Sequence, residues 1–214
     1  MIINVYKPKT WTSFDVVARL RTLLHTKKVG HAGTLDPLAQ GVLIVLTEED
    51  TKNYGKYMHT KKEYIADIAL GLDSDSYDLG TPVYKHNKNI TNFEDINLAS
   101  YIGTLNQVVP SYSAVRIAGK RLYKSAREGT VDLTTLPSKN VEIFELEKLE
   151  EYIKDFGEFK NITVIKVRIA CSSGFYVRSF AHDIGGVLVE LLRTKVGDFK
   201  VEDSIKNWDS LVQP

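Results

Sequence analysis

The sequence predicts an α+β fold in which short strands and helices alternate along 214 residues. Residues 42–46 are all apolar, as is typical of a buried strand. Residues 165–169 alternate apolar and charged side chains, which predicts a strand with one solvent-exposed face. Thr12 and Asp15 form a capping pattern before apolar residues at helical spacing, and this predicts an amphipathic helix. The length fits one domain, so we expect a single domain over residues 1–214.

Two further helices are expected. Thr91 and Glu94 repeat the capping pattern, which predicts a helix that runs to about Gly103. Apolar residues at helical spacing predict a core helix over residues 177–192, with Val177, Phe180, Ala181, Ile184, Leu188, Leu191 and Leu192 on its buried face. Tyr176 and Arg178 would then lie where a strand turns into this helix. The acidic stretch 145–160 is expected to be a mobile excursion.

The loop around Asp36 is the part of the chain most informative about function. Pro37 pushes the backbone of Asp36 toward an extended conformation, so the carboxylate is presented and not wound into a helix. Gly30 and Gly33 bracket the loop, and glycine permits positive φ and close approach of a ligand. His31 precedes the carboxylate by five residues. Taken alone, the pattern fits an ordinary Asp-Pro turn equally well.

Charge alone does not indicate a nucleic-acid partner. With 28 basic and 27 acidic side chains the net charge is +1, whereas many nucleic-acid binders are strongly basic. The distribution is uneven, however, because residues 116–127 hold five basic side chains and no acid. Three of these, Lys120, Lys124 and Arg127, share a helical face by spacing. Such a run is either a solvated helix face or a surface that steers an RNA backbone.

Composition excludes several classes of protein. The single cysteine, Cys171, rules out an internal disulfide framework, favours a reducing cytoplasm and is expected to be a buried apolar side chain. No apolar stretch reaches transmembrane length and the N-terminus does not resemble a signal peptide, so we expect a soluble, cytoplasmic protein. The five histidines are scattered without metal-ligand spacing, and residues 73–78 fail the calcium-loop pattern. We therefore expect no metal site.

The string Gly30–Leu43 resembles the catalytic motif of the TruB family of tRNA pseudouridine synthases. The resemblance continues in order through Lys7-Pro8, Lys62-Glu63-Tyr64, Asp75 with Asp78, Pro110–Ala114, Tyr176-Val177-Arg178 and Arg193–Gly197. Thr10 stands where the family usually has glycine, and the small C-terminal RNA-binding PUA domain common in the family is not expected here.

This resemblance implies a pseudouridine synthase fold, with a mixed, mostly antiparallel central sheet flanked by helices. It implies an isomerase that converts uridine 55 of the tRNA T loop to pseudouridine. The base would be flipped out of the RNA, and Asp36 would be the nucleophile, attacking either ribose C1′ or uracil C6. The reaction is redox-neutral and imports no group, so no cofactor is expected.

The resemblance also implies roles for other residues. Arg178 would be the cation that keeps Asp36 ionised, Tyr64 would stack on the flipped uracil, and Tyr176 and Leu191 would line the pocket. Contacts to RNA are expected from Lys7, His31, Arg116, Lys120, Lys124 and Arg127.

The expected partner is the T stem-loop of tRNA, bound by a monomer that needs neither a protein partner nor a membrane. Three other functions stay open at this point. A guide-RNA-dependent enzyme of the related dyskerin class would share the catalytic motif. A non-catalytic RNA-folding protein would use the basic run but leave the Asp36 loop unexplained. A small-molecule α/β enzyme would fit the near-neutral charge but none of the long motifs.

Overall fold

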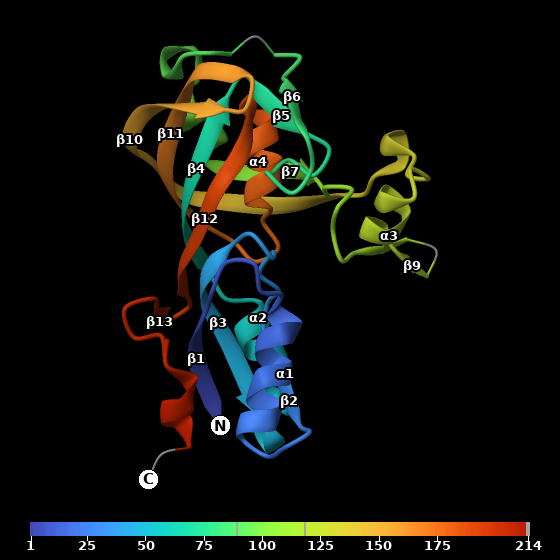
Figure 1. Cartoon of the computed structure of the whole chain (residues 1–214), viewed down its shortest axis with the longest axis vertical. Coiled ribbons are helices and arrows are strands. Elements are labelled where there is room, and N and C mark those ends of the chain that lie inside the picture. The colour runs from blue at the N-terminus through green and yellow to red at the C-terminus, as the bar shows by residue number, and fades with distance from the viewer. Residues whose placement is uncertain (89, 118, 213–214) are drawn as a thin grey trace. The chain divides into compact units, whose positions relative to one another are not determined.

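The computed structural model describes residues 1–88, 90–117 and 119–212. Within them, nine strands form a mixed sheet with the order β1-β3-β12-β4-β11-β10-β7, in which β2 also pairs with β3 and β13 with β12 (Figure 1). The pairs β1–β3, β2–β3, β12–β13 and β7–β10 are antiparallel, and β3–β12 is parallel. The predicted α+β class with a mostly antiparallel sheet is confirmed.

The strands of this sheet are β1 (Ile2–Lys7), β2 (Val29–His31), β3 (Gln40–Thr47), β4 (Lys62–Leu70), β7 (Gly103–Val108), β10 (Ser138–Phe156), β11 (Phe159–Cys171), β12 (Gly186–Val196) and β13 (Phe199–Lys200). Two small antiparallel ladders join β5 (Leu72–Ser74) to β6 (Val83–Lys85) and β8 (Arg116–Ile117) to β9 (Lys120–Arg121). The helices are α1 (Ser13–Leu23), α2 (Tyr54–Met58), α3 (Leu122–Arg127) and α4 (Val177–Asp183).

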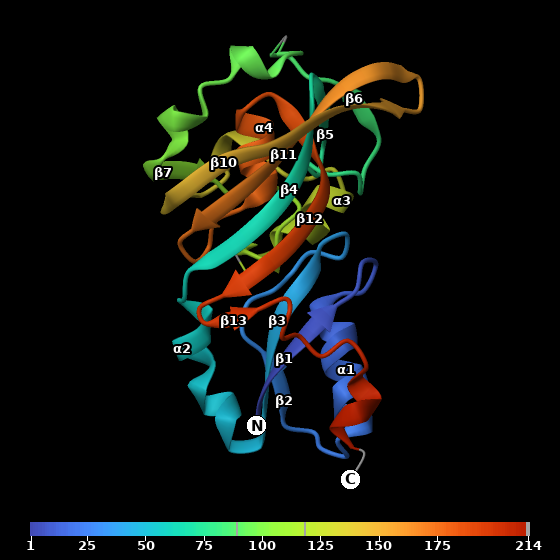
Figure 2. The ribbon, with the colours of Figure 1, turned by 90° about the vertical axis from the view of Figure 1, so that its left-hand side faces the viewer.

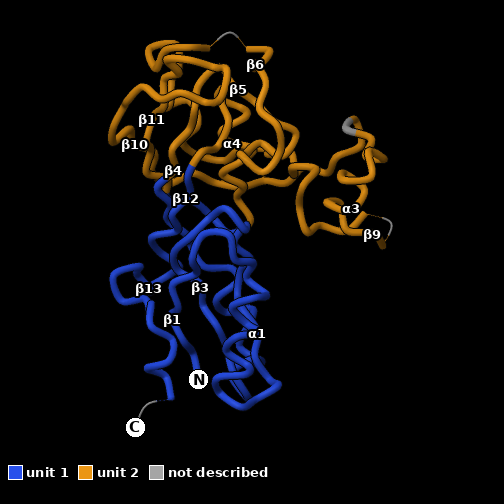
Figure 3. The backbone as a smooth tube through the Cα atoms, viewed as in Figure 1, with its two compact units in different colours: residues 1–65, 170–173, 190–214 blue, residues 66–169, 174–189 orange. Residues whose placement is uncertain are grey.

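The chain forms two compact units (Figure 3). Unit 1 comprises residues 1–65, 170–173 and 190–214, and unit 2 comprises residues 66–169 and 174–189. Strands β4, β11 and β12 each contribute residues to both units. Of the helices that the structure describes, none is both long and apolar enough to span a membrane.

Unit 1 is built around β3, whose residues 41–47 are all buried. One face of β3 packs with α1 and β1 in a cluster of Ile3, Val5, Val16, Val17, Leu20, Val29, Leu43 and Val45. The other face packs in a second cluster of Ala32, Val42, Ile44, Leu46 and Val196. Burial on both faces explains why residues 42–46 form an unbroken apolar run. The predicted cap of α1 is confirmed, since Thr12 and Asp15 form a capping box.

The predicted helix over residues 177–192 is wrong in length. Helix α4 ends at Asp183, and Gly186–Val196 is the strand β12. Gly185 has φ +87°, and a Cβ on Gly186 would lie 2.7 Å from the backbone oxygen of Ala69, so this glycine pair permits the turn and the close approach of the strand. Leu188 and Leu191 therefore lie in a strand and not in a helix. The β-branched residues Val187 and Val189 favour the strand conformation.

Two other expectations are corrected. The helix expected to run from Thr91 to about Gly103 is absent: residues 91–102 hold only the short 3₁₀ helices η2 (Phe93–Asp95) and η3 (Leu98–Tyr101), because asparagines 92 and 97 favour local turns. The acidic stretch 145–160 belongs to β10 and β11, which run side by side as a long hairpin (Figure 2). Arg168 pairs across this hairpin with Glu145 and Glu147, and its neighbours Val167 and Ile169 are buried, so the predicted one-sided strand is confirmed.

Candidate active site

The loop that carries Asp36 lies between β2 and β3 in unit 1. Asp36 is half-buried and outside any helix, as expected, and its carbonyl accepts from the Ala39 amide at 3.1 Å in a tight turn. Gly33 has φ +99°, which confirms its predicted conformation. Gly30 does not adopt a positive φ, because it lies in β2 and pairs with Leu46 of β3.

Lys7 holds this loop from the inside. Its side chain is fully buried, and Nζ donates to the carbonyls of Trp11 at 2.5 Å, Pro8 at 2.9 Å and Pro37 at 3.3 Å. Burial lowers the pKa of Lys7 to about 8, and the negative charge of Asp36 opposes that shift. The ammonium group is enclosed and occupied by backbone carbonyls in this structure, and the expected contact between Lys7 and RNA stays a prediction.

Arg193 holds the same loop from β12. Its guanidinium is 1% exposed, with Nε donating to Val42 O at 2.8 Å, Nη2 to Gly33 O at 3.2 Å and Nη1 to Thr34 O at 3.3 Å. The backbone of Arg193 pairs with Gly41 in the parallel β3–β12 ladder. The role of Arg193 was not predicted, although an arginine after two leucines in an apolar stretch is a usable signal of a buried cation.

Tyr64 and Lys62 line the same part of unit 1. Tyr64 is buried, and burial raises the pKa of its phenol to about 12. The positive charge of Arg193 and a hydrogen bond from the Arg193 side chain act in the opposite direction. Lys62 donates to the carbonyls of Met58 and Thr60 at 2.8 and 2.7 Å, and burial lowers its pKa to about 8. Unit 1 thus gathers three buried cations, a buried phenol and the Asp36 carboxylate.

The other predicted residues of unit 1 are enclosed. Leu191 is 6% exposed, and Cys171 is fully buried, with its pKa raised to about 12 by burial, which confirms the prediction of an apolar role. His31 is half-buried, and burial together with the charge of Arg193 lowers its pKa. A neutral His31 therefore predominates near pH 7.

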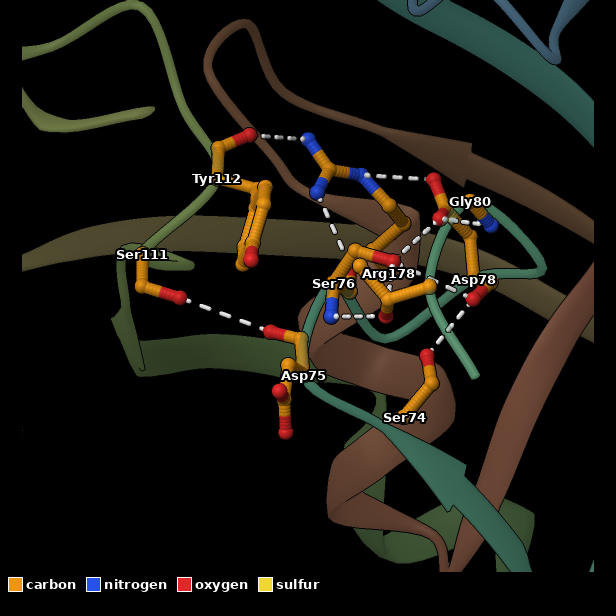
Figure 4. A network of polar contacts seen from close by, with 9 residues as sticks. Ser74, Asp75, Ser76, Asp78, Gly80, Ser111, Tyr112 and Arg178 are labelled. Carbon is orange, nitrogen blue, oxygen red and sulfur yellow. Dashed lines mark hydrogen bonds and ion pairs between the residues drawn. The ribbon is translucent and has the colours of Figure 1, made fainter. Parts of the chain in front are cut away.

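In unit 2, Arg178 lies in a network of polar contacts (Figure 4). Its Nη1 donates to Ser76 O at 2.9 Å, its Nη2 donates to Tyr112 O at 3.0 Å, and its Nε is 3.7 Å from Oδ2 of Asp78. Asp78 is itself fixed, since its Oδ1 accepts from Ser76 Oγ at 2.6 Å and from the Gly80 amide at 2.9 Å. The predicted junction is confirmed, because Arg178 stands in the first turn of α4.

Tyr176 immediately precedes α4 and is fixed through its backbone. Its amide donates to Oε1 of the buried Gln107 at 2.8 Å, and Nε2 of Gln107 donates back to its carbonyl at 3.0 Å. The Lys139 ammonium lies 4.3 Å from the centre of the half-buried tyrosine ring.

Comparison with known proteins identifies the family of the chain. The sequence profile of the TruB family pseudouridylate synthase N-terminal domain matches residues 21–177, which include Asp36 and Tyr64. The chain belongs to this family. It is a pseudouridine synthase, an isomerase.

Relatives match this TruB family chain over nearly its whole length. The tRNA pseudouridine synthase B of Parabacteroides distasonis is 39% identical, over 94% of this chain and 87% of the relative. That of Clostridium tetani is also 39% identical, over 97% and 71% of the two chains.

Solved structures also resemble the chain. A Cbf5-Nop10-Gar1 complex contains a chain with a TM-score of 0.67 and 26% identity, and an H/ACA RNP bound to a substrate RNA contains one with a TM-score of 0.64 and 25% identity. Each match covers 96% of this chain and about half of the solved chain. The pseudouridine synthase fold is thereby confirmed.

The basic run of this TruB family member is exposed but is not one helical face. Lys120 pairs in β9, whereas Lys124 and Arg127 lie on α3, so the predicted common face is wrong for Lys120. Arg116 is exposed on β8, directly opposite Arg121. The glycine at 119 has φ +83° and lets the chain reverse between the two strands.

One further grouping was not visible in the sequence. Asp73, His86 and His182 of unit 2 bring a carboxylate oxygen and two ring nitrogens within 4.8 Å of one another. The spacing of the histidines along the chain does not reveal this grouping, because the three residues are far apart in sequence. The fold brings them together through β5, the residue after β6, and α4.

Proposed function

We propose that the chain converts uridine 55 in the T loop of tRNA to pseudouridine, with Asp36 as the nucleophile. The observation that carries the proposal is the anchoring of the Asp36 loop, which Lys7 and Arg193 hold by its backbone carbonyls from two sides. A rigid loop keeps a carboxylate in reacting geometry, as nucleophilic catalysis requires. The names of the 39%-identical relatives support tRNA as the substrate.

These side chains supply every chemical group that the proposed reaction needs. The bond from C1′ to N1 breaks, the uracil turns, a bond forms from C1′ to C5, and the C5 proton leaves while N1 gains one. In the proposed mechanism Asp36 bonds transiently to C1′ or to C6 and is released at the end. Both routes use the same ionised carboxylate, and both are redox-neutral.

Tyr64 is proposed to stack on the flipped uracil. Its pKa of about 12 keeps the phenol protonated in the resting enzyme, so stacking suits it better than a resting role as base. Flipping costs a few kcal/mol, and stacking on an aromatic ring returns about 1–3 kcal/mol per base. We assign Leu191 and Tyr176 to the lining of the substrate pocket and Arg178 as its cation when RNA is bound.

Recognition of the RNA backbone is assigned to the exposed basic residues Arg116, Lys120, Lys124 and Arg127. His31 is proposed to contact the opened loop of the RNA in its neutral form, which the lowered pKa favours. No cofactor or metal takes part in the proposed reaction.

The decisive experiment maps pseudouridine in unmodified tRNA that has been incubated with the purified chain alone. The native chain should modify position 55, and Asp36→Asn should abolish the product while tRNA affinity changes by less than about tenfold, or 1.4 kcal/mol. Asp198→Asn, at an exposed carboxylate of the same unit, is the matched control and should stay active. Substantial turnover by Asp36→Asn would refute the assignment of the nucleophile.

A second candidate, guide-RNA-dependent modification, is favoured by the likeness to a chain from an H/ACA RNP. The same experiment separates the two functions. Product formed on tRNA by the chain without any added RNA or protein supports the stand-alone enzyme, and product that appears only after a guide RNA is added supports the alternative.

A further inference from the structure

Helix α4 carries two side chains that face the turn between β5 and β6. Arg178 and His182 are four residues apart, a spacing that places them on the same side of a helix. Arg178 contacts Ser76 and Asp78 in this turn. His182 contacts the strand that leads into this turn, where Nδ1 lies 3.0 Å from Oδ2 of Asp73 in β5.

The ring of His182 also packs on this turn. It is stacked on Tyr77 with the ring centres 4.1 Å apart and an angle of 22° between the planes. The buried ring of His86 lies next to it, with its centre 4.9 Å from that of His182 and an angle of 49° between the planes. Oδ1 of Asp73 accepts from the Ser74 amide at 2.8 Å, which fixes the carboxylate that His182 meets.

Tyr77 explains why the turn needs a second attachment. Its φ is +61°, a left-handed conformation that is unfavourable for a residue with a large side chain. Such a conformation persists only where the surroundings hold it. Tyr77 stands between Ser76 and Asp78, which both hold Arg178, so a relaxation at Tyr77 would move both contacts.

The protonation of His86 argues against a metal site, although the composition of the cluster would suit one. Nδ1 of His86 accepts from the Lys88 amide at 2.9 Å, so the proton of the neutral ring sits on Nε2. That N–H lies 3.7 Å from Oδ2 of Asp73. A metal would need the lone pair of this same nitrogen, and metal-bound histidines normally donate through their other nitrogen.

We infer that Asp73, Tyr77 and His182 form a positioning device for Arg178: the His182 ring fastens the strained turn to α4, and this fixes the direction of the guanidinium. The inference rests on the proposed role of Arg178 in the reaction. The three side chains do not touch the reacting atoms; they act through the turn that Arg178 binds.

The test is a double-mutant cycle between His182 and Arg178, read by steady-state and single-turnover kinetics on tRNA. His182→Ala should lower kcat by about 10- to 100-fold, as small misplacements of catalytic groups do, with KM changed by less than about threefold. His182→Asn keeps a donor near the position of Nδ1 and should recover part of the loss. In the Arg178→Lys background, His182→Ala should cost less than about threefold more, because the group that it positions has already been replaced.

The matched control is His59→Ala, at an exposed histidine outside the cluster, which should leave kcat unchanged. If His182→Ala fails to fold, Asp73→Asn replaces it, since the amide keeps the shape of the side chain and removes only the charge that faces His182. Thermal unfolding of each variant reports whether it is folded.

The outcomes separate two failures. If Arg178→Lys retains full kcat, the proposed role of Arg178 fails and the inference falls with it. If Arg178→Lys is inactive but His182→Ala and Asp73→Asn are as active as the native chain, the inference alone is overturned. Equal losses from His182→Ala in both backgrounds also overturn it, as does a Tm of the native chain that falls on chelation and recovers with Zn²⁺.

Discussion

Replacing Arg193 by lysine tests whether the anchoring of the Asp36 loop matters for catalysis. Lysine keeps the positive charge but loses the planar fork with which arginine reaches several acceptors at once. Arg193 donates to three carbonyls, those of Val42, Gly33 and Thr34, at 2.8, 3.2 and 3.3 Å. A lysine ammonium on a flexible stem should satisfy about one of them.

The cost follows from the two carbonyls left without a donor. An unsatisfied buried acceptor costs about 1–3 kcal/mol, and the two longer bonds belong at the lower end, which gives about 2–4 kcal/mol in total. A chain of this size loses about 2–4 °C of Tm per kcal/mol, so Tm should fall by about 4–16 °C. The loop that carries Asp36 is freed at the same time, and kcat should fall by about 100-fold.

Calorimetry and single-turnover formation of pseudouridine on tRNA would measure the two effects on the same sample. Arg168→Lys is the matched control, because Arg168 pairs with Glu145 and Glu147 on the exposed side of the hairpin, and its loss should cost less than about 1 kcal/mol. If Arg193→Lys lowers Tm but leaves the single-turnover rate within about threefold of native, Arg193 stabilises the fold without positioning the nucleophile, and the reasoning fails.

Three further predictions concern backbone, pH and salt. Gly41→Ala should destabilise the chain by about 3 kcal/mol or more in urea unfolding. The reason is that Gly41 has φ +108° and an added Cβ would lie 2.3 Å from the Arg193 carbonyl oxygen. Gly55→Ala is the control and should not destabilise the chain in this way, because the space around Gly55 is open. The native chain should gain stability relative to Lys62→Met as the pH rises from about 8 to 10.5. In this pH range the folded state binds fewer protons on Lys62 than the unfolded state does, because burial lowers the pKa of Lys62. An opposite trend in the denaturation midpoints would contradict this. Lys120→Ala with Lys124→Ala should lower tRNA affinity and flatten the salt dependence by about 2, and an unchanged slope would remove both from the interface.

The fold was predicted correctly from the sequence where residues close together in the chain determine the local structure. The cap of α1 depends on Thr12 and Asp15 alone, and Pro37 keeps Asp36 out of a helix whatever lies around it. The unbroken apolar composition of residues 42–46 was enough to predict the buried strand β3. At the end of α4 the apolar spacing was ambiguous, because residues buried on both faces of β12 also fit a helical period.

The rest of the site depends on contacts between distant parts of the chain. Arg193 meets Gly33 and Thr34 only because β12 pairs with β3 in parallel, and no local pattern sets that register. The same holds for Asp73 and His182, which meet because the fold brings α4 next to β5. The roles of Arg193, Asp73 and His182 were therefore not predicted from the sequence.

The anchoring contacts also explain how a chain with a net charge of only +1 can suit a polyanionic substrate. Lys7, Lys62 and Arg193 in unit 1 each donate to backbone carbonyls. A carbonyl satisfies a donor but, unlike a carboxylate, does not cancel its charge, so these cations keep a positive field around them. The lowered pKa values of Lys7 and Lys62 are the cost of holding those charges out of water. The acidic residues that balance them in the total, such as Glu145 and Glu147, lie on the exposed hairpin of unit 2, where they pair with Arg168. Net charge is therefore a poor guide here, because Lys7, Lys62 and Arg193 are buried near the Asp36 loop, whereas acidic residues such as Glu145 and Glu147 lie on the surface.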